Sequence, residues 1–337
     1  MANIKEKKLK ETIKLARSKG FYEGNIQRKV DWSIYTLNQI NDIIDTINFI
    51  NKNIDEVEWK MPSKVVGRPP IYPKKLAKAV LFIELLGIPE RKAEGWLKLL
   101  KHHLNIRENL DDRVIGKSYE NEDVKGILKK VFEKNCDNDG IFCGDGSGLE
   151  QSRKENYEST KKKGLYITTI VDSRQIVQNF SIESKQESQL MHDLVHELKS
   201  KLIKNPQIQY RMTLDAGFID RKLTQLLSDS KIEPFIFPKK NLTFRTKGSL
   251  AWKKMLNFFI EDIQKWLKKY HIRSNVESFF SSLKRIFGIV TKRKPDSIYI
   301  QVLCRAIHNN RRKLNYFRIV NSGRIYTQSP ILQKLYK

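Results

Sequence analysis

Cysteine is scarce in this sequence, and its placement excludes the folds that depend on it. The three cysteines are Cys136, Cys143 and Cys304, and no CxxC pair occurs. Neither a zinc ribbon nor a disulfide framework is therefore indicated. Three scattered thiols are typical of a protein in a reducing cytosol.

Long apolar runs are also missing. The opening residues, MANIKEKKLKE, are charged and lack the apolar core of a signal peptide. The longest apolar stretch, Ala79 to Ile88, is interrupted by Glu84 and is far too short to cross a bilayer. We therefore expect a cytoplasmic protein with no membrane partner.

Negative charge is scarce relative to positive charge. The 337 residues include 64 Lys plus Arg against 38 Asp plus Glu, a formal net charge of +26, and 39% are hydrophobic. That hydrophobic content indicates a folded chain, and the length allows two or three domains. An excess of this size disfavours compaction unless a polyanion neutralises it, so DNA or RNA is the natural partner. An acidic membrane surface is weighed lower, because the basic residues are spread along the chain.

Residues 1–57 have the periodicity of helices. Apolar side chains recur there every three or four positions: Val30, Ile34, Leu37, Ile40, Ile44 and Ile47. The stripe either faces a partner or packs against its own domain, and packing is the commoner use of such a pattern.

A helical hairpin is predicted after a proline-rich linker, MPSKVVGRPPIYP, at residues 61–73. Helices are expected over 74–87 and 90–102, joined by a tight turn, with a third over 121–134. Helix, turn, helix is a layout used to bind DNA, although many short hairpins bind nothing. The basic linker, which includes Arg68, favours DNA binding by residues 58–135 without deciding it.

Strand patterns begin after residue 136. The order is three strands, helix, strand, helix, strand and then helices, with strands expected at 141–143, 165–171, 176–183, 212–215 and 233–238.

Two aspartates follow apolar strands. Asp145 precedes Gly146, Ser147 and Gly148, and Asp215 precedes Ala216 and Gly217. Small residues beside an acid at a strand end leave its carboxylate exposed and let a phosphate backbone approach. Taken singly, either residue is as well explained as a turn-forming or capping aspartate.

A third acid, Glu277, lies in a predicted helix with two distinct faces. At 100° per residue, Tyr270, Arg273, Glu277 and Lys284 form one stripe. The opposite face is apolar, so it pins the helix and fixes the direction of the stripe. A surface helix with a solvated Arg–Glu pair is the simpler alternative. Three acids placed in this way can hold two divalent cations for phosphoryl transfer from DNA, and oxygen ligands suit Mg²⁺.

The segment around Glu277 resembles a known signature. Tyr270, Arg273, Glu277 and Lys284 have the spacing of the Y-(2)-R-(3)-E-(6)-K motif of prokaryotic insertion-sequence DDE transposases. The surroundings of Asp145 (GDGSG) and Asp215 (LDAGF) are similar to the settings of that family's two aspartates. The resemblance covers about residues 136–315 well and 64–135 more loosely. Only about fifteen residues, 239–253, separate the last expected strand from the helical region that follows. The large all-strand insertion that some members of the family carry before the glutamate helix is therefore absent.

The resemblance implies a fold and an organisation. The expected fold class is α/β, with an RNase-H-like catalytic domain of a mixed five-stranded sheet and flanking helices, preceded by a helical DNA-binding region. The expected divisions are an N-terminal helical region (1–57), a helix-turn-helix-like DNA-binding region (58–135), the catalytic domain (136–320) and a C-terminal tail (321–337).

The resemblance also implies an activity: cut-and-paste transposition, with metal-dependent cleavage at transposon ends and 3′-OH strand transfer into target DNA. Asp145, Asp215 and Glu277 would be the catalytic residues and the ligands of two Mg²⁺ or Mn²⁺ ions. The partners would be double-stranded DNA, as terminal inverted repeats and target, and a second copy in a synaptic homodimer associated with the nucleoid. The DNA contacts would be Tyr270, Arg273, Lys284, Arg68 and Lys239. A nuclease without strand transfer and a non-catalytic DNA-binding derivative are the alternatives.

Other patterns are weaker. His192 and His196 have a zinc-compatible spacing, but the H-E-x-x-H arrangement is not met. Trp252, Trp266 and Tyr299 lie among basic residues, where core packing is favoured over base stacking. Clusters of basic residues are read as phosphate contacts, with a solvated face as the alternative for each: 161–163, 239–240, 292–294 and 311–313.

Overall fold

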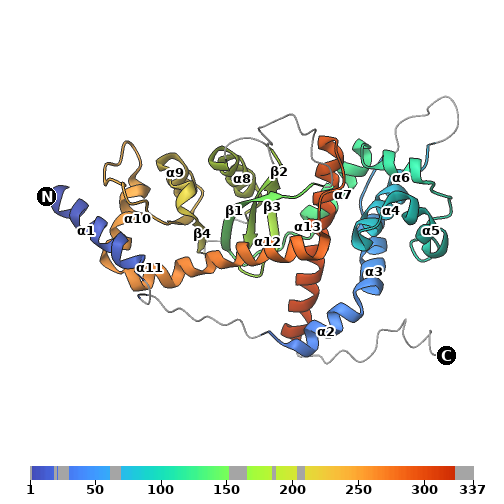
Figure 1. The fold of residues 1–337 in the computed structure, drawn as a ribbon, viewed down its shortest axis with the longest axis horizontal. Coiled ribbons are helices and arrows are strands. Elements are labelled where there is room, and N and C mark those ends of the chain that lie inside the picture. Colours follow the sequence, from blue (N-terminus) through green and yellow to red (C-terminus); the bar gives the residue numbers. More distant parts are fainter. Residues whose placement is uncertain are drawn as a thin grey trace. The chain divides into compact units, whose positions relative to one another are not determined.

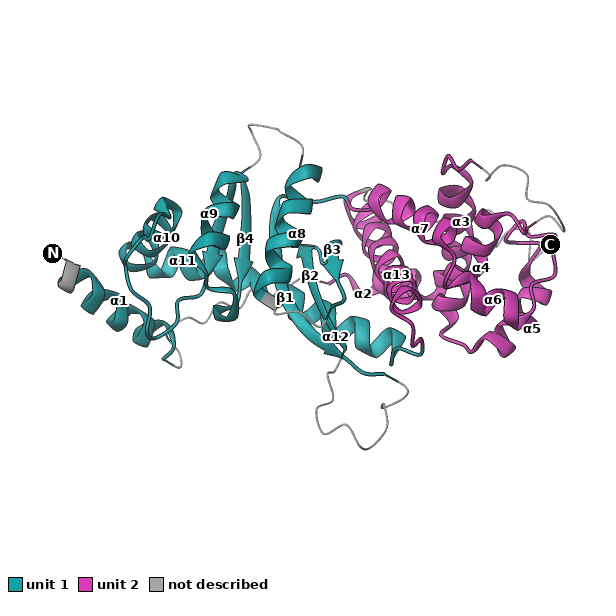
Figure 2. Cartoon of the chain, turned by 90° about the horizontal axis from the view of Figure 1, so that it is seen from above, with its two compact units in different colours: residues 1–27, 137–291 teal, residues 28–136, 292–337 magenta. Residues whose placement is uncertain are grey.

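Two compact units make up the structure, a computed structural model. It describes residues 2–18, 21, 30–60, 70–151, 165–183, 187–202 and 209–322. Unit 1 comprises residues 1–27 and 137–291, and unit 2 comprises residues 28–136 and 292–337 (Figure 2). Each unit therefore combines segments that lie far apart in the sequence.

A mixed five-stranded sheet forms the centre of unit 1 (Figure 1). The strand order is β3-β2-β1-β4-β5. The pairs β1–β2 and β2–β3 are antiparallel, whereas β1–β4 and β4–β5 are parallel. The predicted α/β class with a mixed five-stranded sheet is thereby confirmed. The strands are β1 (Ile141–Leu149), β2 (Leu165–Asp172), β3 (Val177–Ser181), β4 (Tyr210–Leu214) and β5 (Ile232–Ile236).

Strand β1 is longer than its sequence pattern predicts. The apolar run ends at Cys143, and the expectation that Asp145 ends the strand is wrong, because β1 continues to Leu149. The added length pairs with β2, where Asp145 lies opposite Thr169. Pairing with β4, in contrast, stops at Gly144. Asp145 is thus the first residue of β1 beyond its pairing with β4.

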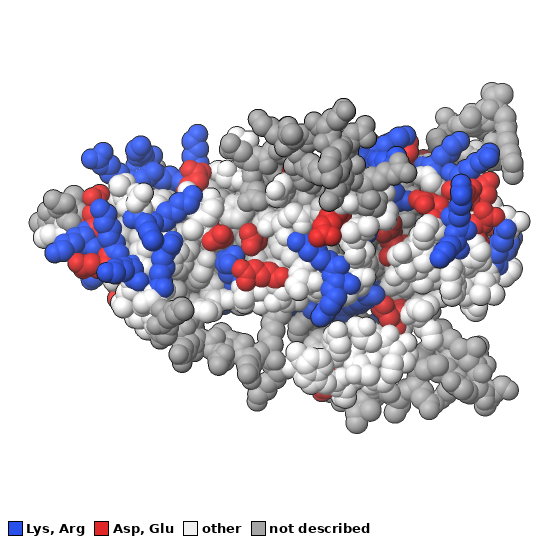
Figure 3. Space-filling view, in the orientation of Figure 1, with Lys and Arg blue, Asp and Glu red and all other residues white. Residues whose placement is uncertain are grey.

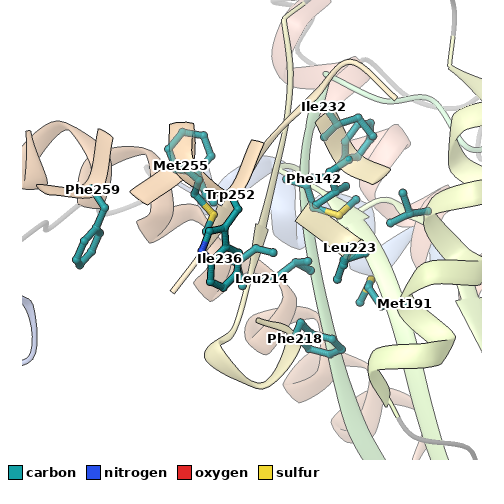
Figure 4. Close-up of a cluster of buried hydrophobic side chains, with 14 of the residues drawn as sticks. Phe142, Met191, Leu214, Phe218, Leu223, Ile232, Ile236, Trp252, Met255 and Phe259 are labelled. Atoms are coloured by element: carbon teal, nitrogen blue, oxygen red, sulfur yellow. The ribbon is translucent and has the colours of Figure 1, made fainter. Parts of the chain in front are cut away.

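Helices and strands of unit 1 share one hydrophobic core. Figure 4 shows part of it, with side chains from β1, β4 and β5 beside those of α8, α9 and α10. Trp252 and Trp266 are 1% and 0% exposed, so the core-packing interpretation of these two residues is confirmed. The helices are α1 (Ala2–Ala16), α8 (Glu187–Lys201), η1 (Ala216–Phe218), α9 (Arg221–Asp229), α10 (Leu250–Glu261), α11 (Ile263–Tyr270), η2 (His271–Arg273) and α12 (Ser274–Phe287).

Unit 2 is helical in its described residues. The long helix α13 packs against α2, α3, α4 and α7, and the predicted helical hairpin is present as α4 and α5. The short helix α6 is not apparent from the sequence pattern. The bounds are α2 (Trp32–Ile40), α3 (Asp42–Asp55), α4 (Pro73–Leu86), α5 (Glu90–Leu100), α6 (Asp112–Ser118), α7 (Glu122–Lys134) and α13 (Pro295–Ser322).

Buried polar contacts join α13 to α4. Glu84 is 5% exposed and accepts hydrogen bonds from the Tyr119 hydroxyl (2.7 Å) and from Gln301 Nε2 (3.1 Å). His308 Nε2 lies 2.7 Å from the Leu81 carbonyl oxygen. Burial lowers the pKa of His308 to about 3, so its ring is neutral at physiological pH. These buried hydrogen bonds help to fix the position of α13 against α4.

The two units divide the chain differently from the expected sequence boundaries. Helix α1 belongs to unit 1, because Leu9 and Ile13 are buried in the core of the sheet. Helix α13 belongs to unit 2, although the expected catalytic domain extends through it. The apolar stripe of the first 57 residues is only partly used, since Val30 and Ile40 are 38% and 71% exposed. No helix in the described ranges has the length and hydropathy needed to cross a membrane.

Gly144 offers a test of how tightly β1 packs beside the two aspartates. A Cβ added at Gly144 would lie 2.6 Å from Leu214 Cδ2 and 2.8 Å from Met191 Cε. We expect Gly144→Ala to lower the free energy of unfolding by about 1–3 kcal/mol, because the core must move to admit the methyl group. The measurement is urea denaturation of the full chain.

Gly148→Ala in the same strand is the matched control. Its Cβ would have its nearest neighbour at 3.9 Å, so the substitution should change the stability little. Equal denaturation midpoints for the two variants would contradict the tight packing at Gly144.

Candidate active site

The pairing of β1 with β4 places two aspartates side by side. Gly144 pairs with Leu214 in this parallel pair; Asp145 is the next residue of β1, and Asp215 directly follows the end of β4. Each carboxylate is held by the backbone that follows it: Asp145 Oδ1 accepts from Gly146 N (2.8 Å), and Asp215 Oδ1 accepts from Ala216 N (2.5 Å). Both acids are half-buried.

Glu277 is carried by α12, which packs against β1 and β2. The expectation of one continuous helix from Tyr270 to Lys284 is wrong. Helix α11 ends at Tyr270, the 3-10 turn η2 follows, and α12 begins at Ser274. The turn contacts β1 and β4, and Cys143 Sγ donates to the Ile272 carbonyl oxygen at 3.1 Å. The break therefore lies where the chain passes over the sheet.

The two-faced character of the glutamate helix is confirmed within α12 as far as Leu283, whereas Ile286, also expected on the buried face, is 41% exposed. Glu277 and Lys284 are exposed, whereas the opposite face is buried against the sheet through Val276, Phe279, Phe280 and Leu283. The apolar face thus fixes the direction in which Glu277 points, as the sequence pattern predicts.

Arg273 joins two of the three acids. Its Nη1 donates to Asp145 Oδ2 (3.2 Å), and its Nη2 donates to Glu277 Oε1. The Arg273 side chain is 20% exposed. Burial opposes its charge, but Tyr270 and the nearby acids outweigh that effect and raise the pKa of Arg273. The guanidinium is therefore a fixed cation between β1 and α12.

The electrostatics of Asp145 confirm that the three acids share one region. Burial is the main cause that raises the pKa of Asp145, and the charges of Asp215 and Glu277 raise it further. The Gly146 N–H and the Arg273 guanidinium act in the opposite direction. Asp145 thus senses both of the other acids, which come from a different strand and from a helix.

The donor chemistry of this region fits a hard divalent cation. Three carboxylates and no thiol or imidazole are the ligands that Mg²⁺ prefers. Among the described residues, however, no three His, Cys, Asp or Glu side chains are close enough together to hold one ion. The contacts of Arg273 account for this spacing, because its guanidinium stands between Asp145 and Glu277.

Two residues of the predicted stripe lie at opposite ends of this region. Tyr270 is half-buried and stacks on Trp266, with ring centroids 4.9 Å apart. Burial, followed by the charges of the acids, raises the pKa of Tyr270, so its hydroxyl stays protonated. Lys284 Nζ donates to Ser147 Oγ at 2.8 Å. Sequence reasoning missed Ser147, although the two-residue period of a strand puts it on the same face as Asp145.

The remaining predicted residues have varied surroundings. His192 Nε2 lies 3.0 Å from Asp220 Oδ2, and Asp220 also caps α9, so this histidine supports the loop after Asp215. His196 and Lys239 are exposed. Arg68 lies outside the described residues.

Two of the basic clusters are largely engaged within unit 2. Lys292 pairs with Glu90 and Lys294 pairs with Glu120. Arg311 and Arg312 both pair with Asp42, and Arg311 is buried. Arg311 therefore does not belong to a solvated face, and its role as a phosphate contact stays a prediction. The cluster at 161–163 lies outside the described residues.

Charge is unevenly distributed over unit 1. Figure 3 shows acidic side chains grouped on the viewed face, with basic side chains gathered over α1, α10 and α11. A polyanion that approaches the acids on this face is therefore attracted by neighbouring cations.

Comparisons with known proteins agree on one family. The family described as "Transposase DDE domain" matches residues 136–307, about half of the chain. A curated protein of Archaeoglobus fulgidus, the "Probable transposase for insertion sequence element ISA1214", is 27% identical over 243 residues, which cover 69% of this chain and 72% of that protein. No solved structure matches significantly.

The contact between Arg273 and Asp145 leads to a prediction about acidity. Arg273→Ala removes the cation that lowers the pKa of Asp145, so that pKa should rise further above its ordinary value. The measurement is a pH titration of the Asp145 carboxyl carbon by NMR.

Lys284→Ala serves as the control, because Lys284 contacts Ser147 and not Asp145. It should shift the pKa of Asp145 less than Arg273→Ala does. If Arg273→Ala leaves the pKa unchanged, the guanidinium does not bridge the acids in solution.

Proposed function

The chain belongs to the transposase DDE domain family, and from this premise we propose that it is an insertion-sequence transposase that cuts transposon ends and joins the freed 3′-OH to target DNA. The observation that carries the proposal is the proximity of three acids. Arg273 pairs with both Asp145 and Glu277, and the charge of Asp215 raises the pKa of Asp145. All four residues lie inside the part of the chain that the family matches.

We further propose that unit 1 is an RNase-H-like catalytic domain. The support is its topology: three antiparallel strands in chain order, followed by two parallel strands added at the β1 edge. In such a sheet, acids on β1 and β4 lie together because those strands are parallel neighbours. A helix that crosses the sheet then supplies the third acid.

Asp145, Asp215 and Glu277 are the proposed catalytic residues and the proposed ligands of two Mg²⁺ or Mn²⁺ ions, since the family generally uses divalent metals. When bound, such ions activate the attacking oxygen and stabilise the leaving one. In the first reaction a water oxygen bonds to phosphorus and the bond to the 3′ oxygen breaks. In the second, that 3′ oxygen bonds to a target phosphorus and displaces the target's own 3′ oxygen.

Arg273 and Lys284 are proposed to hold DNA phosphates. Arg273 neutralises carboxylates in the absence of other cations, and its planar donors fit phosphate equally well. Lys284 is exposed beside Ser147, on the same helix as Glu277. Tyr270 stays protonated and can donate a hydrogen bond to a phosphate oxygen. Lys239 and Arg68 remain proposed DNA contacts on the ground of charge alone.

Recognition of the transposon ends is proposed for residues 58–135. The proposal is supported by the α4–α5 hairpin, in which Gly87 adopts φ 61° and ends α4. Helix α5 begins immediately after the turn and presents Arg91, Lys92 and Trp96 at an exposed hollow of its surface. A synaptic homodimer is proposed from the family alone, because two ends must be cut together.

Glu277→Gln tests the catalytic assignment. The substitution keeps the size of the side chain but removes the charge, so DNA binding should persist while cleavage and strand transfer are abolished. Arg273→Ala and Lys284→Ala should cause partial losses that grow with salt, because one charged hydrogen bond contributes about 1.5–3 kcal/mol. The measurements are gel shift and cleavage of end DNA with Mg²⁺ present.

Glu261→Gln is the matched control, since Glu261 is an exposed acid at the end of α10 in the same unit. It should cut at the wild-type rate. If Glu277→Gln cuts equally fast, Glu277 is only a surface partner of Arg273. Cleavage without joined products would instead indicate a nuclease that lacks strand transfer.

Metal binding can be tested without any reaction. We expect Mn²⁺ added to the full chain to bind with an affinity that falls at least tenfold in Asp145→Asn and in Asp215→Asn, because each substitution removes a ligand. Binding is read from the loss of the free-ion electron paramagnetic resonance signal. Asp229→Asn, an exposed acid of α9, should leave binding unchanged; equal affinity in all three variants would refute the ligand assignment.

A further inference from the structure

A cleft of about 630 Å³ opens in unit 2, and none of the residues assigned to the reaction lines it. Its walls come from α3, α7 and α13, with Asn135 at the end of α7. The lining combines four cations, two carboxylates, four amides and two apolar side chains: Asp45, Asn48, Phe49, Lys52, Asn53, Glu56, Lys134, Asn135, Arg311, Leu314, Asn315 and Arg318. All of these residues are in unit 2, whereas the three acids are in unit 1.

Arg311 is the unusual member of this lining. Its side chain is 4% exposed, and its Nη2 pairs with Asp42. Its Nε and Nη1 have no hydrogen-bond partner among the described residues. Burial of charged donors without acceptors is costly, so an arginine in this position favours an incoming acceptor. An anion in the cleft would supply one after a small movement of the side chain.

The other charges in the lining also favour an anion. Four cationic side chains face two carboxylates, and both carboxylates are engaged. Glu56 pairs with Lys134, and Asp45 Oδ2 accepts from Asn315 Nδ2 at 3.0 Å. Lys52 and Arg318 are exposed at the cleft. Lys134 is paired with Glu56 and Arg311 with Asp42, so Lys52 and Arg318 supply the remaining cationic charge of the cleft, opposite Asp45.

The uncharged side chains of the cleft indicate which class of anion fits it. Asn48 is an exposed amide, which can both donate to and accept from the edge of a nucleobase. Phe49 is half-buried beside it and offers an aromatic surface on which a base can stack. Phosphate-binding cations next to an amide and an aromatic ring are the complement of a nucleotide rather than of a bare inorganic ion.

We propose that the cleft between α3, α7 and α13 binds a nucleoside phosphate, through Lys52, Arg311 and Arg318 to the phosphate and Asn48 and Phe49 to the base. The group is supplied either by DNA or by a free nucleotide. Binding of a nucleoside phosphate that is part of DNA rests on the proposed function. Binding of a free nucleotide does not depend on it.

The test uses the full chain without divalent metal, so it is independent of cleavage. Lys52→Ala combined with Arg318→Ala removes two exposed cations and leaves the buried Arg311–Asp42 pair intact. Lys199→Ala combined with Lys201→Ala, both exposed in the last turn of α8 in unit 1, is the control of equal charge. The probes are thymidine monophosphate, followed by calorimetry, and a DNA duplex, whose affinity is measured against salt concentration.

Two results support the proposal and identify the source. Thymidine monophosphate binding that falls at least tenfold in the cleft variant, but not in the control, indicates a free nucleotide. If the monophosphate does not bind, DNA is the expected source. The slope of log affinity against log salt should then decrease by about 2 in the cleft variant. DNA should also slow the alkylation of a cysteine introduced by Asn48→Cys.

Two other results overturn it. One is nucleotide binding that is unchanged in the cleft variant. The other is the absence of nucleotide binding together with unaltered DNA affinity and unprotected Asn48→Cys. A chain that binds in the cleft but does not cleave DNA with Mg²⁺ would refute only the proposed function, so the two failures are distinguishable.

Discussion

The active-site region depends on one constraint: acids that repel one another must be held together. Asp145, Asp215 and Glu277 come from β1, β4 and α12, and burial already raises the pKa of Asp145. The Arg273 guanidinium offsets this repulsion, since it donates to both Asp145 and Glu277. Without a cation among them, three carboxylates in a half-buried region would favour a more open arrangement.

The scaffold around that region is built to resist such opening. Parallel pairing of β1 with β4 fixes the two aspartates, and the absence of a side chain at Gly144 lets β1 lie against Leu214 and Met191. The buried face of α12 holds Glu277 from the other side. The three acids are therefore positioned by strand pairing and by the packing of apolar side chains.

The 64 lysines and arginines are used in two ways. Some are paired with acids inside unit 2, where Arg311 and Arg312 share Asp42 and Lys292 pairs with Glu90. The rest remains on the surface, including the basic side chains of α1, α10 and α11. These surface cations are available to a polyanion, because they are not paired inside the helical bundle.

The sequence by itself determined the order of strands and helices along the catalytic segment, the two-faced helix that carries Glu277 and the choice of the three acids as candidates. These features depend on local periodicity and spacing. It did not determine that β1 runs past Asp145, or that the Tyr270–Lys284 segment breaks at residues 271–273. Nor did it determine that α1 and α13 each pack in a unit whose other residues are distant in the sequence. Those features were decided by partners far along the chain: β2 pairs with the extended β1, and η2 contacts β1 and β4. The same holds for Arg311, which reads as a surface cation in sequence and is buried because Asp42 lies opposite it in the folded bundle.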